Sequence, residues 1–207
     1  MNYSLGRSNV KIRFATLGIV LLTLCIIVLH NNIAGNQKQN EIPVQSTTTR
    51  TVSTTTMMKL TSSAFGENQS IPSHYTCDGA SISPELAISD VPLLAKSLVI
   101  LMDDPDVPTN IKPDGNFDHW VMYDIAVDTK VILEGQFAGT LGANGTGKLG
   151  YIGPCPPDRE HRYFFKLYAL DIKLNLSEGK TKAEVQKAIE GHVIESTELI
   201  GLYNRKK

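Results

Sequence analysis

The stretch Ser97-Leu-Val-Ile-Leu-Met-Asp-Asp-Pro-Asp-Val-Pro108 passes from an apolar run directly into carboxylates and prolines. The apolar part is short and rich in aliphatic residues, so it predicts a buried strand. Two further runs, residues 120–125 and 163–170, have the same character. Short runs of this kind, separated by turn residues, predict a domain dominated by β-structure, in which mostly antiparallel strands form a sandwich.

Two connections between these strands are long and rich in proline and glycine. They span residues 103–115 and 139–157, and both exceed an ordinary hairpin turn. Long ordered loops on a strand scaffold are where binding sites are often found. Near the C-terminus, Thr181-Lys-Ala-Glu184 is a capping box, which predicts a helix with an apolar face made of Val185, Ala188, Ile189 and Val193.

Residues 14–34 form an uncharged, largely apolar segment that follows Arg7, Lys11 and Arg13. Its continuous apolar part would be roughly 24 Å long as a helix, against a bilayer core of about 30 Å. We expect a transmembrane helix; a cleaved signal peptide, which would release a secreted domain, and a buried core helix are the alternatives. The positive flank predicts that residues 1–13 stay in the cytoplasm and that the domain lies outside.

Residues 35–57 are polar and low in complexity, and much of this segment is Ser and Thr. It cannot bury enough apolar surface to offset its ordering entropy, so we expect a flexible stalk before a domain at residues 58–207. The first 58 residues hold five basic side chains and one acidic one, which leaves 15 basic and 20 acidic side chains for the domain. Nucleic acid is not an expected partner, because it requires a clustered positive face.

Several motifs at predicted strand ends carry side chains suited to binding a small anion. They are the acidic segment 103–108, the pair Asp118-His119, the turn Gly153-Pro154 and the segment His161-Arg-Tyr163. A carboxylate can fix the tautomer of a neighbouring imidazole, and a turn amide can donate to an anion. Two histidines, a tyrosine hydroxyl and a turn amide would form a cradle for a phosphate or carboxylate. The alternative is that the histidines are structural residues of the core.

These segments, in their order and approximate spacing, resemble the signature segments of the phosphatidylethanolamine-binding protein family. The resemblance covers residues 58 to about 205. The resemblance is seen in Asp104-Pro-Asp-Val-Pro108, in His119 at the head of an apolar strand, in Gly153-Pro154, and in His161-Arg-Tyr163 before Phe-Phe-Lys-Leu-Tyr168. The prokaryotic, Raf-kinase-inhibitor-like branch is more similar at Tyr75-Thr-Cys-Asp-Gly79, Ile82-Ser-Pro-Glu-Leu86, Glu190-Gly-His-Val193 and Glu198-Leu-Ile-Gly201.

The resemblance implies a Greek-key antiparallel β-sandwich, here with a C-terminal helix, and a shallow pocket for phosphate-like groups. Carried over position by position, the ligand-binding residues are Asp104, Asp106, His119, Trp120, Gly153, Pro154, His161 and Tyr163. In eukaryotic members such a pocket is linked to phospholipid headgroups and to inhibition of kinases or serine proteases. Residues 112–117 are an insertion near the site. Asp118 replaces an aromatic residue of some members and makes the entrance more negative.

Cys77 and Cys155 are the only cysteines of the domain, since Cys25 lies in the apolar segment. Such a pair tends to be oxidised outside the cytoplasm, so we expect a disulfide. The alternative makes Cys155 a nucleophile paired with His161. The histidines and cysteines lack zinc-ligand spacing, and a calcium-loop-like start at Asp114 lacks the later ligands, so we expect no metal and no cofactor.

The sequence therefore predicts a membrane-tethered domain that binds a small anionic group, such as a phosphate or a phospholipid headgroup, without catalysis. A second hypothesis is inhibition of a serine protease or kinase through an exposed loop within residues 106–116. A third is a hydrolase that uses Asp104, His119 and His161 as acid and base.

Overall fold

The computed structural model describes residues 56–205. The expected cytoplasmic segment 1–13, the membrane segment 14–34 and nearly all of the stalk 35–57 lie outside the described residues. Within residues 56–205, no helix is both long enough and apolar enough to span a bilayer. The expectations for the N-terminal segments therefore stay predictions.

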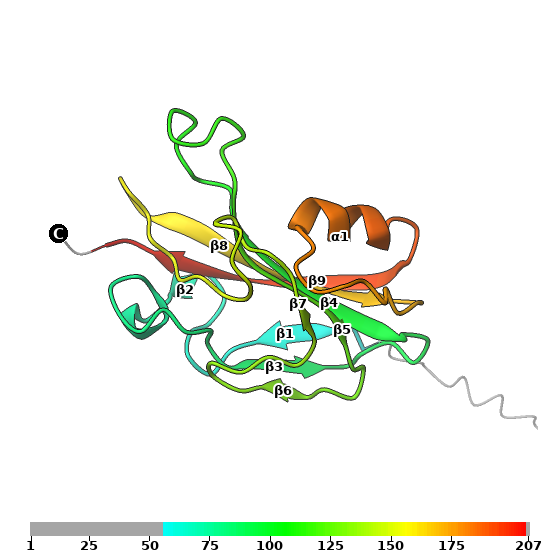
Figure 1. The fold of residues 1–207 in the computed structure, drawn as a ribbon. Coiled ribbons are helices and arrows are strands. Elements are labelled where there is room, and N and C mark those ends of the chain that lie inside the picture. The colour runs from blue at the N-terminus through cyan, green and yellow to red at the C-terminus, as the bar shows by residue number, and fades with distance from the viewer. Residues whose placement is uncertain (1–55, 206–207) are drawn as a thin grey trace, which may run out of the picture. The chain divides into compact units, whose positions relative to one another are not determined.

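Two sheets make up the domain (Figure 1). The smaller sheet is antiparallel and has the order β1 (Lys59–Thr61), β3 (Leu86–Ser89) and β6 (Val131–Ile132). The larger sheet has the order β2 (Gln69–Ser70), β9 (Val193–Tyr203), β8 (His161–Leu170), β4 (Ser97–Asp104), β5 (Phe117–Ile125) and β7 (Thr140–Leu141). Its pairs are antiparallel except for the short parallel pair of β2 with β9. A 3-10 turn, η1 (Ser73–Tyr75), and one helix, α1 (Lys182–Ile189), complete the described elements.

The strand order β8-β4-β5-β7 in the larger sheet has the 4-1-2-3 arrangement of a Greek key. Within residues 56–205, the mostly β fold with one helix agrees with the prediction for this domain, but the expected C-terminal helix is not the last element. The chain continues after α1 into β9, a strand of eleven residues that lies between the edge strand β2 and β8. It pairs along the whole of β8. Val193, expected on the helix face, is the first residue of this strand.

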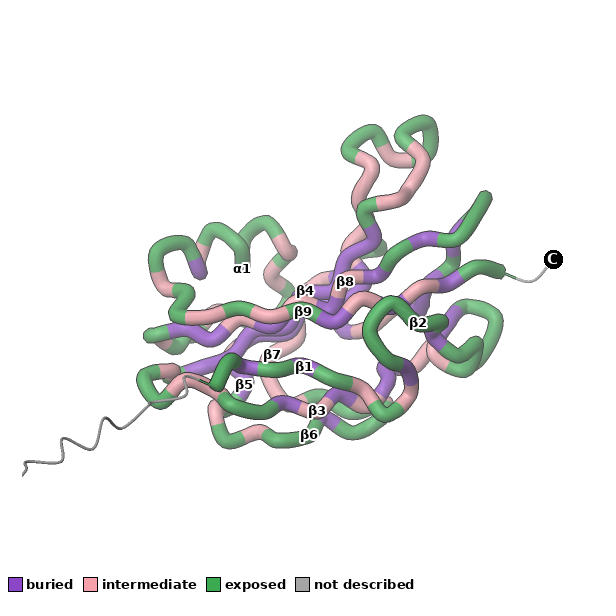
Figure 2. Tube along the Cα trace, turned by 180° about the vertical axis from the view of Figure 1, so that it is seen from behind, coloured by how far each residue is buried: buried purple, intermediate pink, exposed green. Residues whose placement is uncertain are grey.

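The main hydrophobic core lies between the two sheets, and a smaller one lies between the larger sheet and α1. Alternate residues of β4 point to opposite sides, so Leu98, Ile100 and Met102 enter the main core while Val99 and Leu101 face the helix. All eight residues of β4 are buried because both faces are covered. Figure 2 shows the buried residues gathered along the central strands of the larger sheet.

The three predicted strands are present, with longer bounds than the apolar runs. β4 continues into Asp103 and Asp104, β5 begins at Phe117, and β8 begins at His161. The capping box of α1 is confirmed, with the Thr181 hydroxyl accepting from the Glu184 amide and the Glu184 carboxylate accepting from the Thr181 amide. Asp104, His119, His161 and Tyr163 therefore lie within the strands, whereas Asp106, Gly153 and Pro154 lie in the connections.

Candidate ligand-binding pocket

A pocket of about 270 Å³ opens where β4 ends and β5 begins. Its walls come from these two strands, from the loop of residues 105–116 and from the segment 152–157. The lining residues are Asp104, Val107, Ile111, Phe117, His119, Ile152, Gly153, Cys155 and Pro157. Most of these side chains are apolar, so the few polar groups determine how a ligand would be oriented.

An irregularity in β5 sets the position of His119. Met102 of β4 pairs with Trp120, but the next residue, Asp103, pairs with Asp118, so His119 is an extra residue on its strand. Such a bulge interrupts the strict alternation of side chains. The His119 ring lies edge-on to Phe117 at 4.9 Å and to Tyr163 at 5.2 Å between ring centroids.

A backbone carbonyl fixes the tautomer of His119. Its Nδ1 is 2.7 Å from the carbonyl oxygen of Ile152, which can only accept, so Nδ1 carries the proton. Burial lowers the pKa of His119 below its usual 6.5, against the opposing effects of this hydrogen bond and of Asp104. The ring is therefore neutral at pH 7, and Nε2 is a free acceptor that gains a proton only when an anion stabilises it.

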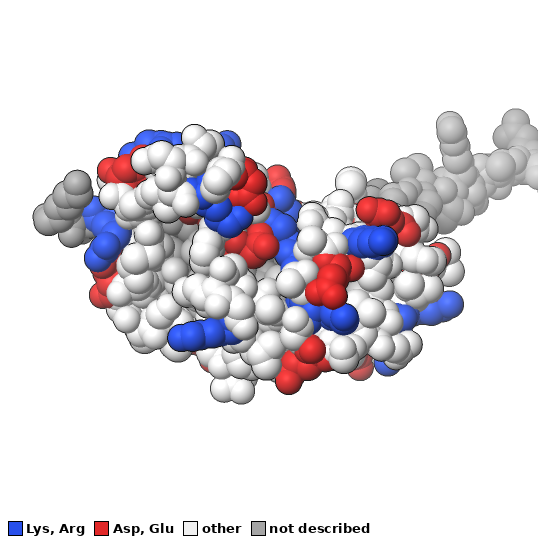
Figure 3. All heavy atoms as spheres, turned by 45° about the horizontal axis from the view of Figure 1, so that its top comes forward, with Lys and Arg blue, Asp and Glu red and all other residues white. Residues whose placement is uncertain are grey.

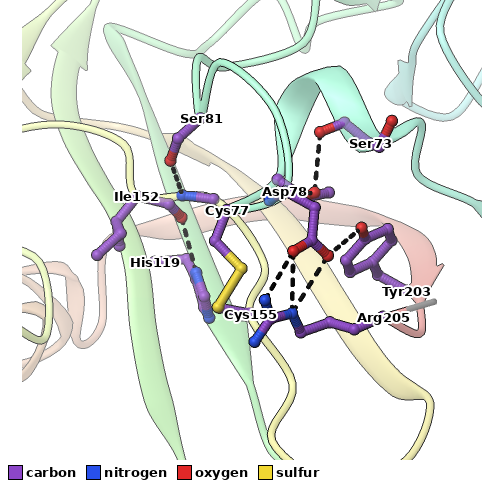
Figure 4. Close-up of a disulfide and its surroundings, with 11 residues drawn as sticks. Ser73, Cys77, Asp78, Ser81, His119, Ile152, Cys155, Tyr203 and Arg205 are labelled. Carbon is purple, nitrogen blue, oxygen red and sulfur yellow. Dashed lines mark hydrogen bonds and ion pairs between the residues drawn. A yellow bond between two sulfur atoms is a disulfide. The ribbon is translucent and has the colours of Figure 1, made fainter. Parts of the chain in front are cut away.

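The segment 152–157 is held against the loop after η1 by several bonds (Figure 4). The Gly153 amide donates to the Ser81 hydroxyl at 2.9 Å, and the Cys77 amide donates to the Pro154 carbonyl at 3.0 Å. Cys77 and Cys155 form a disulfide in the structure. A Cβ at Gly153 would lie 2.8 Å from backbone atoms of the facing loop, so only glycine fits this close approach.

Asp104 lies between the pocket and the buried imidazole ring of His161. The two ring nitrogens of His161 lie 2.8 Å from Asp104 and 2.9 Å from Asp158. A carboxylate can only accept a hydrogen bond. The two bonds therefore require either that both ring nitrogens of His161 carry a proton or that one of the two carboxyl groups is protonated. His161 has no solvent exposure, so it acts on the pocket only through Asp104.

Tyr163 lies beside both histidines and is fully buried. Its hydroxyl has no hydrogen-bonding partner among the described residues. Burial, and then the nearby charge of Asp104, raise the pKa of Tyr163, so the hydroxyl keeps its proton and remains a donor. A buried donor without a protein partner is costly unless water or a ligand satisfies it.

The structure brings together only part of the predicted site. Asp104, His119 and Gly153 line the pocket, and His161 and Tyr163 lie behind it. The other three predicted residues have different surroundings. Asp106 forms a double hydrogen bond with Arg162, Trp120 packs edge-on against Phe137 and Tyr151 in the main core, and the Pro154 carbonyl accepts from Cys77.

Some pocket residues were not identified from the sequence. Val107, Ile111 and Phe117 supply an apolar wall, Ser81 fixes the Gly153 turn, and Asp158 forms a bond with His161. Val107 and Ile111 are apolar residues in a long loop after a strand, and this could have indicated the apolar wall of a pocket. Ser81 and Asp158 lie in ordinary turn sequences and carry no such signal.

A larger hollow of about 710 Å³ lies near the C-terminal end of the domain. The one cation among its described lining residues is already paired, since Arg205 donates to Asp78, which also accepts from the Tyr203 hydroxyl, and its third charged residue, Glu160, is acidic. On the face in Figure 3, Lys and Arg alternate with Asp and Glu and form no broad positive stripe. Neither feature offers an anion the unpartnered donor that the smaller pocket has.

Comparison with known proteins fits this arrangement. The family described as phosphatidylethanolamine-binding protein matches residues 61–204, which contain both sheets and the pocket. The chain belongs to this family. A relative from Chlamydia trachomatis, named UPF0098 protein, is 46% identical over 149 residues, which are 72% of this chain and 99% of the relative. A relative of the same name from Methanothermobacter thermautotrophicus is 47% identical, with 72% of this chain and 99% of the relative covered.

Solved structures of phosphatidylethanolamine-binding protein homologues place the chain in the prokaryotic branch. The crystal structure of a homologue from Chlamydia trachomatis superposes with a TM-score of 0.71 at 45% identity, and the match covers 72% of this chain and 99% of that one. The crystal structure of YbcL from E. coli gives 0.66 at 25% identity and covers 73% of this chain and 100% of that one. In each of these relatives the match covers 99% or more of the chain.

Proposed function

We propose that the domain binds a small anionic ligand of phosphate type in the pocket at the ends of β4 and β5, and that it does so without catalysis. In the same proposal, residues 14–34 tether the domain to a membrane and hold it outside the cytoplasm. Family membership supports ligand binding in general, and the geometry of the pocket supports the anionic group.

The observation that carries the proposal is a pair of polar groups whose hydrogen-bonding capacity is unused. Nε2 of His119 forms no hydrogen bond with the described part of the chain, and neither does the Tyr163 hydroxyl. Both groups lie at or directly behind a pocket, and their rings are 5.2 Å apart. An oxyanion in the pocket would accept from a protonated His119, and the Tyr163 ring supports the His119 ring from behind the pocket.

Asp104 restricts which anions fit. It lines the pocket and is 3% exposed, so a ligand oxygen beside it is repelled unless one of the two groups carries a proton that they can share. A phosphate monoester that keeps one proton can donate it to Nε2 of His119 or to Asp104. The apolar wall of Val107, Ile111 and Phe117 then contacts the organic part of the ligand. We therefore expect phosphate monoesters to bind more tightly than inorganic phosphate.

Calorimetric titration of residues 56–207 with phosphoethanolamine and with inorganic phosphate tests the proposal. Wild-type domain should bind both in a saturable manner, and His119→Ala should lose at least tenfold in affinity, about 1.4 kcal/mol. Leu133→Ala is the matched control, because Leu133 is exposed and lies outside the pocket. Absence of binding by the wild-type domain would rule out the anionic ligand.

A second candidate, inhibition of a protease or kinase, is favoured by one observation. The loop of residues 105–116 projects from the body of the domain (Figure 1), and Ile111 within it is 60% exposed. Inhibition through this loop would survive His119→Ala and would be lost on shortening the insertion at residues 112–117. An inhibition assay against serine proteases with both variants separates this function from ligand binding.

A further inference from the structure

Exposed apolar side chains gather at the end of the domain opposite to the pocket. Leu93 and Leu94 form a turn before β4 and are 102% and 78% exposed. The turn leads into Lys96, whose amide donates to the Leu170 carbonyl, and Leu170 pairs with Val193. Hence five of the ten exposed large apolar side chains, Met57, Leu93, Leu94, Val193 and Ile194, belong to this end of the described domain.

The described chain begins at the same end. The Met58 amide donates to the Glu195 carboxylate at 2.7 Å, and Glu195 directly follows Ile194. Residues 35–57 connect this point to the apolar segment 14–34. If this connection is the flexible stalk that its composition predicts, its average span is roughly 27 Å, and a domain tethered by residues 14–34 would remain within reach of the bilayer.

We infer that this end of the domain, which we call the leucine end, rests on a lipid bilayer. The inference rests on the tether in the proposed function. Soluble domains rarely leave adjacent large apolar side chains fully exposed without a partner. A bilayer surface buries apolar side chains of a domain already held beside it by its own chain. The leucine end is defined by Met57, Leu93, Leu94, Val193 and Ile194.

Charge near the leucine end gives no preference for anionic lipid. Lys59 lies 4.0 Å from Asp90, His192 lies 2.9 Å from Asp171, and Glu195 beside Ile194 is acidic. The attraction therefore comes from the apolar side chains, and vesicles of phosphatidylcholine should be sufficient. This choice of lipid separates the apolar contact from non-specific charge attraction.

The orientation has a consequence for the ligand. β4 begins just after the leucine turn and ends at Asp104 in the pocket. Its eight residues span roughly 26 Å at about 3.3 Å per residue, so the pocket opens far from the bilayer surface. The ligand then enters from the aqueous phase as a soluble phosphate compound, and a headgroup of the tethering bilayer cannot reach the pocket.

The test uses the full chain in phosphatidylcholine vesicles, with Cys25→Ser to leave no free thiol and an environment-sensitive fluorophore on Leu94→Cys. We expect the fluorophore to emit at a shorter wavelength than it does in water. Its fluorescence should also decrease when the lipid chains are brominated. The control label at Leu133→Cys, which is 59% exposed on another element, should show neither effect. A label at Ile194→Cys should lose its shift when Leu93 and Leu94 are both replaced by serine.

Each failure has a different meaning. Chain that does not float with the vesicles would overturn both the tether and this inference. Chain that floats while the label on Leu94→Cys behaves as in water would overturn the inference alone. Binding of phosphoethanolamine, measured separately on the domain, tests the pocket and is independent of both results.

Discussion

His119 is the residue on which the behaviour of the pocket depends most. A bulge brings it beside Tyr163, the Ile152 carbonyl fixes its tautomer, and burial lowers its pKa. Motifs at predicted strand ends suggested His119, Asp104 and Gly153, and the resemblance to the family named them as pocket residues. Trp120, carried over with them, packs in the main core instead, since adjacent strand residues and a bulge cannot be assigned to a face without knowing the register.

Anion affinity should increase as the pH falls through the region below 6.5. The free ring is neutral above its lowered pKa, and an anion favours the protonated ring, so binding takes up a proton. The affinity for sulfate, which does not titrate in this range, should rise by up to about tenfold per pH unit. Calorimetry from pH 8 to pH 5 measures this, with His119→Gln as a control that should show no such slope. A wild-type affinity independent of pH would contradict the assignment.

Replacing Asp106 should leave ligand affinity nearly unchanged. Its carboxylate is held by the Arg162 guanidinium, which lowers the pKa of Asp106 to about 2, and the side chain lies outside the pocket lining. Asp106→Asn removes an ion pair whose Arg162 side chain is about half exposed, and we expect a cost of about 1 kcal/mol of stability. A phosphoethanolamine affinity within twofold of wild type is expected by titration. A tenfold loss would show that Asp106 contacts the ligand.

At the level of elements, the apolar runs predicted the central strands well, because both faces of β4 and much of β5 and β8 are covered. β9 was not predicted. Its first half is polar and partly exposed, with Glu195 and Glu198 among its residues, so it lacks the apolar character of a buried strand. The short edge strands have two or three residues each and depend on their partners more than on their own sequence.

Removing the disulfide should destabilise the domain strongly. Cys77 and Cys155 are 78 residues apart, and closing a loop of this size restricts the unfolded chain by about 4 kcal/mol. Denaturant unfolding of Cys77→Ser/Cys155→Ser should show a loss of this order. The single variant Cys77→Ser should lose a similar amount, since either change breaks the bond. Equal free energies of unfolding in all three proteins would exclude a stabilising bond.

The cap of α1 should contribute a smaller, local amount. Thr181→Ala removes the acceptor of the Glu184 amide and should lower the free energy of unfolding by about 1 kcal/mol. Lys187→Ala, at an exposed position of the same helix, is the matched control and should have little effect. Ligand affinity should not change in either variant, because α1 covers the sheet face opposite to the main core. No difference between the two variants would mean that the capping box is not formed in solution.

At the scale of the described domain, the sandwich places the proposed ligand pocket and the proposed bilayer contact at opposite ends of its strands. The pocket lies where β4 ends, and the leucine end lies where β4 starts. The sandwich was predictable because strand runs and turns recur along the domain. The pairing that joins Asp104 to His161 and His119 to Tyr163 was not, since contacts between residues far apart in sequence depend on the completed topology.

An NMR titration of residues 56–207 with phosphoethanolamine measures directly whether the pocket binds a small anion. We expect saturable shifts of the His119 ring, the Tyr163 ring and the Gly153 amide, with no change at Leu133. Shifts confined to Asp78 and Arg205 would place binding in the larger hollow and contradict the claim. So would a spectrum without any shift at millimolar ligand.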